Sequence, residues 1–99
     1  MKNPELEKKR EIIDRHISFL RERYNVKIIG IFGSLVRGKQ KKYSDIDIMV
    51  EFSDPVGFFK FIELEEFLSK ILKRKVDLVT KKALKPAIKQ DVLKDMVYV

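Results

Sequence analysis

The residues of this sequence best suited to chemistry are two aspartates that lie two positions apart. Asp45 and Asp47 belong to a segment in which polar and apolar residues alternate from residue 45 to residue 52. This alternation predicts a β-strand, and on a strand both carboxylates face the same side, about 6.7 Å apart. Two carboxylates at that separation can bind one hard divalent cation or hold two, and Mg²⁺ is the cation that we expect.

A glycine–serine pair precedes the aspartates and indicates a site for phosphate. Gly33 and Ser34 follow the apolar segment 27–32, which its β-branched residues and short length predict to be a strand. Glycine lets the backbone approach a ligand closely, and the helical turn expected at 35–38 would present unpaired N–H groups to an anion. Arg37 is near enough in the chain to bind the same anion. A cation between this anion and the carboxylates would offset their repulsion.

Asp77 supplies a third carboxylate within the segment 76–80, which is also predicted to be a strand. If this strand lies beside 45–52, Asp77 reaches the same cations as Asp45 and Asp47. Three carboxylates around two Mg²⁺ ions suit nucleotidyl transfer, because one ion activates the attacking hydroxyl, the other holds the triphosphate, and both stabilise the pentavalent phosphorus.

Each of these features also has an ordinary explanation when it is taken alone. A glycine–serine pair after a strand is often only a turn, and an Asp-x-Asp pair is often a solvated strand face. A single acid such as Asp77 or a single arginine such as Arg37 is usually on the surface. The functional interpretation rests on the combination, since these features fall at strand ends or on one strand face.

The hydrophobic periodicity predicts the elements that would position these residues. We expect a helix over 4–24, strands over 27–32, 45–52 and 76–80, a second helix over 56–73, a last helix from Pro86 and a short final strand over 97–99. This order predicts an α+β or α/β fold in which helices pack against a small mixed sheet of three or more strands. The polar and basic segment 39–43 is expected to be a loop.

The apolar face of each predicted element identifies the expected core. In the first helix these residues are Leu6, Ile13, Ile17, Leu20 and Tyr24. In the second they are Phe58, Phe61, Ile62, Leu64, Leu68, Ile71 and Leu72, and in the last they are Ile88, Val92 and Met96. The strand 45–52 adds Ile46, Ile48, Val50 and Phe52 on the face opposite the carboxylates.

Composition excludes several classes of protein. The 99 residues carry 22 Lys and Arg against 15 Asp and Glu, a formal charge of +7, and they contain one histidine and no cysteine. Disulfide scaffolds, thiol catalysis and multi-histidine zinc sites are therefore excluded. No apolar run approaches the ~20 residues that span a bilayer, and the N-terminus has no apolar signal region. We expect a single domain over residues 1–99 in a reducing, cytoplasmic setting.

Two motifs together resemble the signature of the polymerase-beta-type nucleotidyltransferase superfamily. They are Gly33-Ser-Leu-Val-Arg-Gly38 and Ser44-Asp-Ile-Asp-Ile-Met-Val50, with ten residues between Ser34 and Asp45. The short chain, and the ending Val76-Asp-Leu-Val-Thr80 before Leu84-Lys-Pro86, resemble the minimal nucleotidyltransferases, the MNT family, over roughly residues 8–99. Members of this family are antitoxins of HEPN–MNT toxin–antitoxin pairs. The resemblance implies a nucleotidyltransferase fold and a Mg²⁺-dependent protein adenylyltransferase that moves AMP from ATP to a tyrosine hydroxyl of the HEPN toxin, with release of pyrophosphate.

The resemblance also implies a role for each residue at a matching motif position. Gly33, Ser34, Arg37 and Ser44 would bind the nucleotide, and Asp45, Asp47 and Asp77 would bind the metal ions and form the catalytic set. Asp77, the third carboxylate, would share a metal and take the proton of the acceptor hydroxyl. Val36 departs from the alanine that is common at its position, but it lies outside the ligand set.

The sequence leaves other functions open. The protein could neutralise a toxin by binding without catalysis, could modify a small alcohol, or could bind RNA through the basic residues Lys39, Lys41 and Lys42 or 73–75, which also fit an ordinary solvated surface. It has no extra domain to bind a small acceptor and no interleaved aromatic residues to stack bases, so we expect a folded protein partner, not a membrane or a nucleic acid substrate. The acceptor residue, the number of AMP units, the nucleotide preference and a homo-oligomer stay open.

Overall fold

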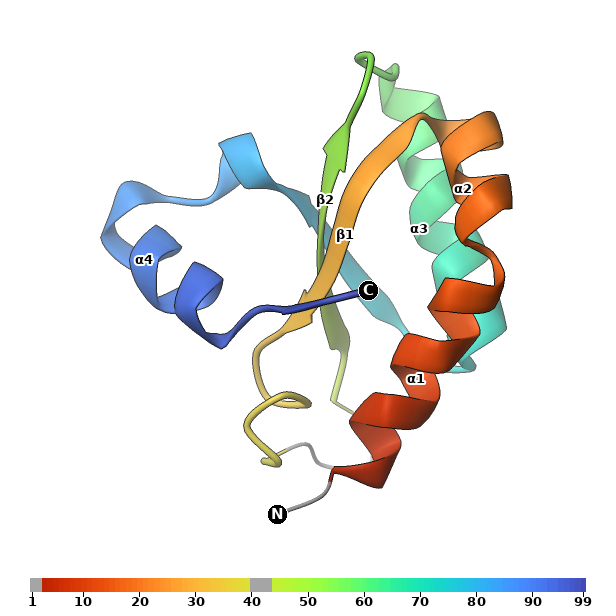
Figure 1. Cartoon of the computed structure of the whole chain (residues 1–99). Coiled ribbons are helices and arrows are strands. Elements are labelled where there is room, and N and C mark those ends of the chain that lie inside the picture. Colours follow the sequence, from red (N-terminus) through yellow and green to blue (C-terminus); the bar gives the residue numbers. More distant parts are fainter. Residues whose placement is uncertain (1–2, 40–43) are drawn as a thin grey trace.

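A four-stranded mixed sheet forms the middle layer of the fold (Figure 1). The computed structural model describes residues 3–39 and 44–99. Its strands lie in the order β3-β2-β1-β4, where β1 is Val26–Phe32, β2 is Ile46–Phe52, β3 is Val76–Thr80 and β4 is Val97–Tyr98. β1 is antiparallel to β2 and β4, whereas β3 is parallel to β2. The three predicted strands and the short final strand are confirmed.

Helices cover the two faces of this sheet unequally. α1 (Pro4–Arg15), α2 (Ile17–Tyr24) and α3 (Phe58–Leu72) lie on one face, and α4 (Pro86–Asp95) lies on the other (Figure 1). A short 3-10 helix, η1 (Lys81–Ala83), follows β3. The predicted packing of helices against a small mixed sheet is therefore confirmed. None of the helices in the described ranges combines the length and the hydropathy that a bilayer crossing needs.

The main core lies between the sheet and the three helices α1, α2 and α3. Every second residue of β2 from Ile46 to Val50 is fully buried on this side. Leu64, Leu68 and Leu72, spaced by about one helical turn along α3, are also fully buried. Burial of a side chain of this size contributes about 1.5–3 kcal/mol. This layer therefore fixes the position of β2, whose other face carries the half-buried Asp47 and Glu51 on either side of the buried Met49.

The predicted helix over 4–24 is interrupted at His16, so the prediction of one continuous helix is wrong. The His16 N–H donates to the carbonyl of Ile13 (3.0 Å), which is a three-residue spacing, and the His16 backbone lies at φ −103°, ψ 8°. The N–H of Leu20 then donates to the His16 carbonyl (2.9 Å) and begins α2. The apolar positions Ile13, Ile17 and Leu20 continue across the break, and for that reason the periodicity does not reveal it.

Two predicted core residues are exposed instead. Phe58, the first residue of α3, is 72% exposed, and Ile88 of α4 is 49% exposed. α4 has no fully buried residue, and Val92 and Met96 are only half-buried. Periodicity identifies an apolar face of a helix, but it does not reveal whether another element packs against that face. The second helix also begins at Phe58, two residues later than predicted.

Candidate active site

Asp47 and Asp77 lie side by side near the beginning of β2 and β3. They are partner positions in the parallel pairing of these two strands. Neighbouring strands lie about 4.8 Å apart, and partner residues of a parallel pair point to the same face of the sheet. The prediction that segment 76–80 lies beside segment 45–52 is therefore confirmed, and Asp77 reaches the neighbourhood of the other aspartates.

Two side chains of α3 hold β3 in this register. The Val76 N–H donates to Ser69 Oγ (3.0 Å). The Leu78 N–H donates to Glu65 Oε2 (3.0 Å). Both bonds satisfy donors on the outer edge of β3, because β3 is the first strand of the sheet and pairs only with β2 among the described strands. Val76 and Leu78 are buried, whereas Asp77 between them is exposed on the opposite face.

Asp45 lies immediately before β2, and the backbone around it is tied to the segment that follows α3. Arg74 Nη2 donates to the carbonyl oxygen of Ser44 (2.6 Å). The Ile46 N–H donates to the carbonyl of Lys75 (2.9 Å) and begins the parallel pairing. These two bonds fix the chain on both sides of Asp45, whose side chain is exposed. Arg74 is a positioning residue that the sequence indicates only as a member of a basic run.

The glycine turn (residues 33–38) follows β1 and approaches the carboxylates. Gly33 has φ +80°, a region of backbone conformation that favours glycine. The Arg37 N–H donates to the Gly33 carbonyl (3.1 Å), so the predicted helical turn is present as a hydrogen-bonded turn. The N–H groups of residues 34–36 find no acceptor among the described residues. Unpaired donors at the start of such a turn suit an anion.

Gly33 also lies against the carboxylate of Asp47. Phe32 and Asp47 are partner positions of β1 and β2, so the glycine turn begins beside this aspartate. A Cβ atom at Gly33 would overlap Asp47 Oδ2 and would lie 3.1 Å from Asp47 Cγ. Glycine therefore suits the positive φ here, and a larger residue would also displace the Asp47 carboxylate. The close approach places the donors of the turn next to the carboxylates.

The three carboxylates and Arg37 influence one another electrostatically. Burial raises the pKa of the Asp47 carboxyl above its usual range, and the negative charges of Asp77 and Asp45 raise this pKa further. The positive charge of Arg37 acts in the opposite direction and lowers it. A cation or another positive group beside Asp47 would reduce the repulsion between the carboxylates.

Arg37 also contacts the last turn of α4. Arg37 Nη1 lies 3.9 Å from Asp95 Oδ2, and both side chains are about half exposed. An exposed ion pair of this kind adds little to stability, but it links the glycine turn to α4. The two residues are far apart in the sequence, and no local pattern indicates that they meet.

The donor set of this cluster suits a hard divalent cation. Carboxylate oxygens are the ligands that Mg²⁺ prefers in proteins, and Asp47 and Asp77 are already adjacent. In residues 3–39 and 44–99, however, no three His, Cys, Asp or Glu side chains form a ready-made cation site. Asp45 is close enough to raise the pKa of Asp47 but does not complete such a group. Metal binding by Asp45, Asp47 and Asp77 therefore stays a prediction.

The other predicted site residues fall around this cluster. Ser34 is half-buried in the glycine turn, and Ser44 is half-buried before Asp45, where its carbonyl accepts the bond from Arg74. Nucleotide binding by Ser34 and Ser44 stays a prediction. Lys39 is exposed, whereas Lys41 and Lys42 of the predicted basic loop lie outside the described residues.

Residues 13–99 match the family model of the nucleotidyltransferase domain. The chain belongs to the nucleotidyltransferase domain family. It is 49% identical over 94 residues to the protein adenylyltransferase MntA of Thermococcus cleftensis, and the alignment covers 95% of this chain and 95% of the relative. This nucleotidyltransferase is therefore of the MntA-like protein adenylyltransferase type, as its motifs imply.

Solved structures of the family share this fold. A minimal nucleotidyltransferase matches with a TM-score of 0.78 and 26% identity, covering 93% of both chains. A toxin–antitoxin complex with AMP-PNP matches with a TM-score of 0.70 and 30% identity, covering 86% of this chain and 69% of the other. The MNT antitoxin complex of a tri-AMPylated HEPN toxin from Shewanella oneidensis matches with a TM-score of 0.64 and 26% identity, covering 91% and 70%. The predicted nucleotidyltransferase fold is confirmed.

Proposed function

We propose that this protein transfers AMP from ATP to a tyrosine hydroxyl of a cognate HEPN toxin and thereby silences the toxin. The observation that carries the proposal is the register of Asp47 and Asp77 beside a turn whose N–H groups at 34–36 find no acceptor in residues 3–39 and 44–99. Similarity to MntA supports it, as do the solved antitoxin complexes with a nucleotide analogue and with an AMPylated HEPN toxin. We place the reaction in the cytoplasm, with residues 1–99 acting as one domain.

In this proposal the glycine turn binds the triphosphate of ATP. The N–H groups of residues 34–36 donate to phosphate oxygens, and Gly33 allows the backbone to come close to them. Arg37 offsets part of the phosphate charge, and it would exchange its long contact with Asp95 for the phosphate. The hydroxyl groups of Ser34 and Ser44 contribute further polar contacts to the nucleotide.

The carboxylates act on the reacting groups. Asp45, Asp47 and Asp77 would hold two Mg²⁺ ions. These ions would neutralise phosphate charge and lower the pKa of the attacking hydroxyl. Asp77 takes the proton of that hydroxyl. The hydroxyl oxygen forms a bond to the α-phosphorus of ATP, the bond from this phosphorus to the bridging oxygen of the β-phosphate breaks, and pyrophosphate leaves with the electron pair.

The exposure of the site suits an acceptor on another protein. Asp45 and Asp77 are exposed, and only Asp47 is half-buried. A tyrosine side chain on the surface of a folded partner can therefore reach the carboxylates without entering a deep pocket. This openness fits a partner that contributes its own surface to the acceptor side of the site.

Labelled ATP, MgCl₂ and the cognate HEPN toxin test the proposal. The wild-type protein should label the toxin, and Asp47→Asn should lower the rate by about 100-fold or more. Asp14→Asn, a matched change at an exposed position of α1, should keep the wild-type rate. Equal labelling by wild type and Asp47→Asn would refute the catalytic role. If Asp47→Asn still neutralised the toxin without labelling it, the protein would act as an antitoxin by binding.

A further inference from the structure

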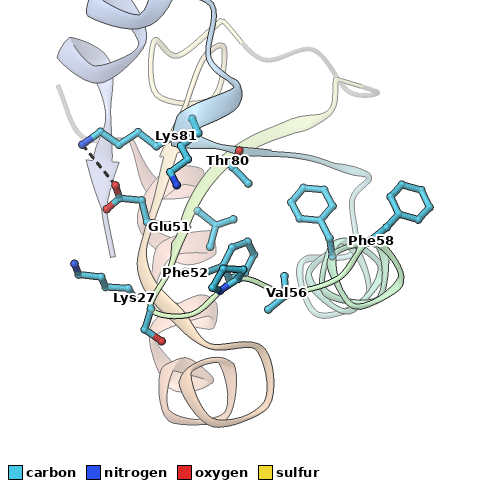
Figure 2. Close-up of a pocket in the computed structure, with 12 residues that line it drawn as sticks. Lys27, Glu51, Phe52, Val56, Phe58, Thr80 and Lys81 are labelled. Atoms are coloured by element: carbon cyan, nitrogen blue, oxygen red, sulfur yellow. Dashed lines mark ion pairs between the residues drawn. The ribbon is translucent and has the colours of Figure 1, made fainter.

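A groove opens at the end of the sheet away from the carboxylates, where β2 and β3 finish (Figure 2). Its volume is about 630 Å³. Its apolar lining comes from β2, from the segment after it and from the first turns of α3, and includes Phe52, Val56, Phe58 and Phe61. We call the surface formed by these four residues the apolar groove. None of the three site aspartates lines it.

One aromatic residue of the apolar groove, Phe58, and its neighbour Phe59 outside the groove are unusually exposed, whereas Phe52 and Phe61 are half-buried. Phe58 is 72% exposed and Phe59, the next residue, is 86% exposed, and their rings meet edge to face at 5.7 Å. Contiguous exposed apolar residues of this kind mark interaction surfaces. The groove therefore offers apolar area that the described part of the chain does not bury.

Basic side chains lie along one side of this apolar surface. Lys27, Lys81 and Lys82 line the groove together with a single acid, Glu51. Lys81 Nζ pairs with Glu51 Oε1 at 3.7 Å, and Figure 2 shows this pair on one side of the groove and Phe58 on the other. The other two lysines leave a net positive rim. A partner segment with an apolar side chain between carboxylates would complement both the rim and the lining.

Two other occupants fit this surface less well. A second copy of this chain carries the same charge of +7 and would bring lysines against lysines. Single-stranded RNA needs aromatic faces on which bases stack. The rings of Phe52 and Phe61 meet edge to face at 72°, as Phe58 and Phe59 do at 69°, so they do not form a flat stacking platform. The concave, apolar shape favours a protein side chain.

The apolar groove is close enough to the carboxylates for one partner to cover both. Glu51, at the edge of the groove, lies four positions from Asp47 on the same face of β2, which corresponds to about 13 Å. Phe52 of the apolar groove lies on the opposite face, so a partner that covers both must reach around the end of the sheet. A protein interface of standard size buries about 800 Å² on each partner, a patch roughly 30 Å wide. We propose that the apolar groove docks the protein that receives AMP, through an apolar side chain flanked by carboxylates. This inference rests on the proposed function, because it assigns the docking surface for the same reaction.

Steady-state kinetics with the purified cognate HEPN toxin test this docking role. Phe58→Ser and, separately, Lys82→Glu should each raise the KM for the toxin about fivefold or more, and should leave the KM for ATP and the kcat at saturating toxin unchanged. The Kd of the toxin, measured without ATP, should rise in parallel. Ile88→Ser and Lys8→Glu are the matched controls, since both residues are exposed outside the groove, and they should behave as wild type.

The possible results separate the docking role from the proposed function. A toxin KM and Kd that do not change in either groove variant overturn the docking role even if AMP transfer is confirmed. A rise in the KM for ATP with an unchanged toxin KM overturns it too, because the groove would then belong to the nucleotide site. Toxin that binds the wild type more tightly than the groove variants but never receives AMP refutes the proposed function and supports docking. Binding of a U-rich RNA that depends on Phe58, without an effect on the toxin, overturns the docking role.

Discussion

Asp47 and Asp77 are partner positions on neighbouring parallel strands, although the whole of α3 separates them in the sequence. Their charges repel, and this repulsion adds to the effect of burial in raising the pKa of Asp47. The contact persists because Ile48 and Leu78, the next pair in the same register, are buried on the opposite face and fix the two strands. An unfavourable contact that the core maintains is typical of a functional site.

We predict that Asp47→Asn is more stable than wild type at neutral pH without divalent cations. The folded protein holds a proton on Asp47 more readily than the unfolded chain does, because the pKa of Asp47 is raised in the fold. The ionised carboxylate therefore lowers the free energy of unfolding at pH values above the folded pKa. This penalty disappears as the pH falls below the unfolded pKa of about 3.9, where the variant and wild type should converge.

Thermal unfolding in EDTA between about pH 3 and pH 8 measures this difference. Asp14→Asn removes an exposed carboxylate from α1 and should change the melting temperature little at any pH. A variant Asp47→Asn that melts below wild type at neutral pH would show that the ionised carboxylate stabilises the fold, contrary to the raised pKa.

We predict that Mg²⁺ stabilises the wild-type protein and that the effect depends on the aspartates. A ligand that binds only the folded state at ten times its Kd adds about 1.4 kcal/mol to the free energy of unfolding. For a chain of this size, that corresponds to a rise of roughly 6–11 °C in the melting temperature. Asp45→Asn and Asp77→Asn should each reduce this rise, and chelation with EDTA should reverse it. An identical rise in wild type and in both variants would place the Mg²⁺ elsewhere on the protein.

The parts of the fold that could be predicted are those with a local signature. The alternation along β2 identified the buried face of Ile46, Ile48 and Val50, because this face follows from a two-residue period. The break at His16 could not be predicted, since the apolar spacing runs through it. The exposure of Phe58 could not be predicted either, because burial depends on whether a distant element covers the helix.

In the candidate site, too, the residues of a local motif could be predicted, whereas contacts between residues far apart in the sequence could not. The motif around Gly33 and the aspartates indicated the turn and the carboxylates, and the resemblance to a family supplied their roles. The ion pair of Arg37 with Asp95 joins residues from separate elements, and no sequence spacing relates them. The same is true of the hydrogen bond from Arg74 to Ser44, which only the packed fold brings together.

We predict that Gly33→Ala disrupts the site more than Gly38→Ala does. Both glycines have a positive φ, so an alanine at either position adds backbone strain of about 1 kcal/mol or more. A Cβ at Gly33 would also overlap Asp47 Oδ2, whereas a Cβ at Gly38 would meet nothing within 4 Å. The rate of AMP transfer should therefore be about tenfold lower in Gly33→Ala than in Gly38→Ala. If the two variants lost the same rate and the same melting temperature, backbone strain alone would explain both losses.

We predict that Arg74 positions Asp45 without contacting the nucleotide. Its Nη2 donates to the Ser44 carbonyl at 2.6 Å, so Arg74→Gln should loosen the segment that carries Asp45 and lower kcat about tenfold, with little change in the KM for ATP. Arg74→Lys keeps a donor and should recover part of the rate. Lys75→Gln is the control, because the Lys75 side chain is exposed and its backbone carbonyl, not its side chain, accepts the bond from the Ile46 N–H. If Arg74→Gln raised the KM for ATP and left kcat unchanged, Arg74 would bind the nucleotide directly.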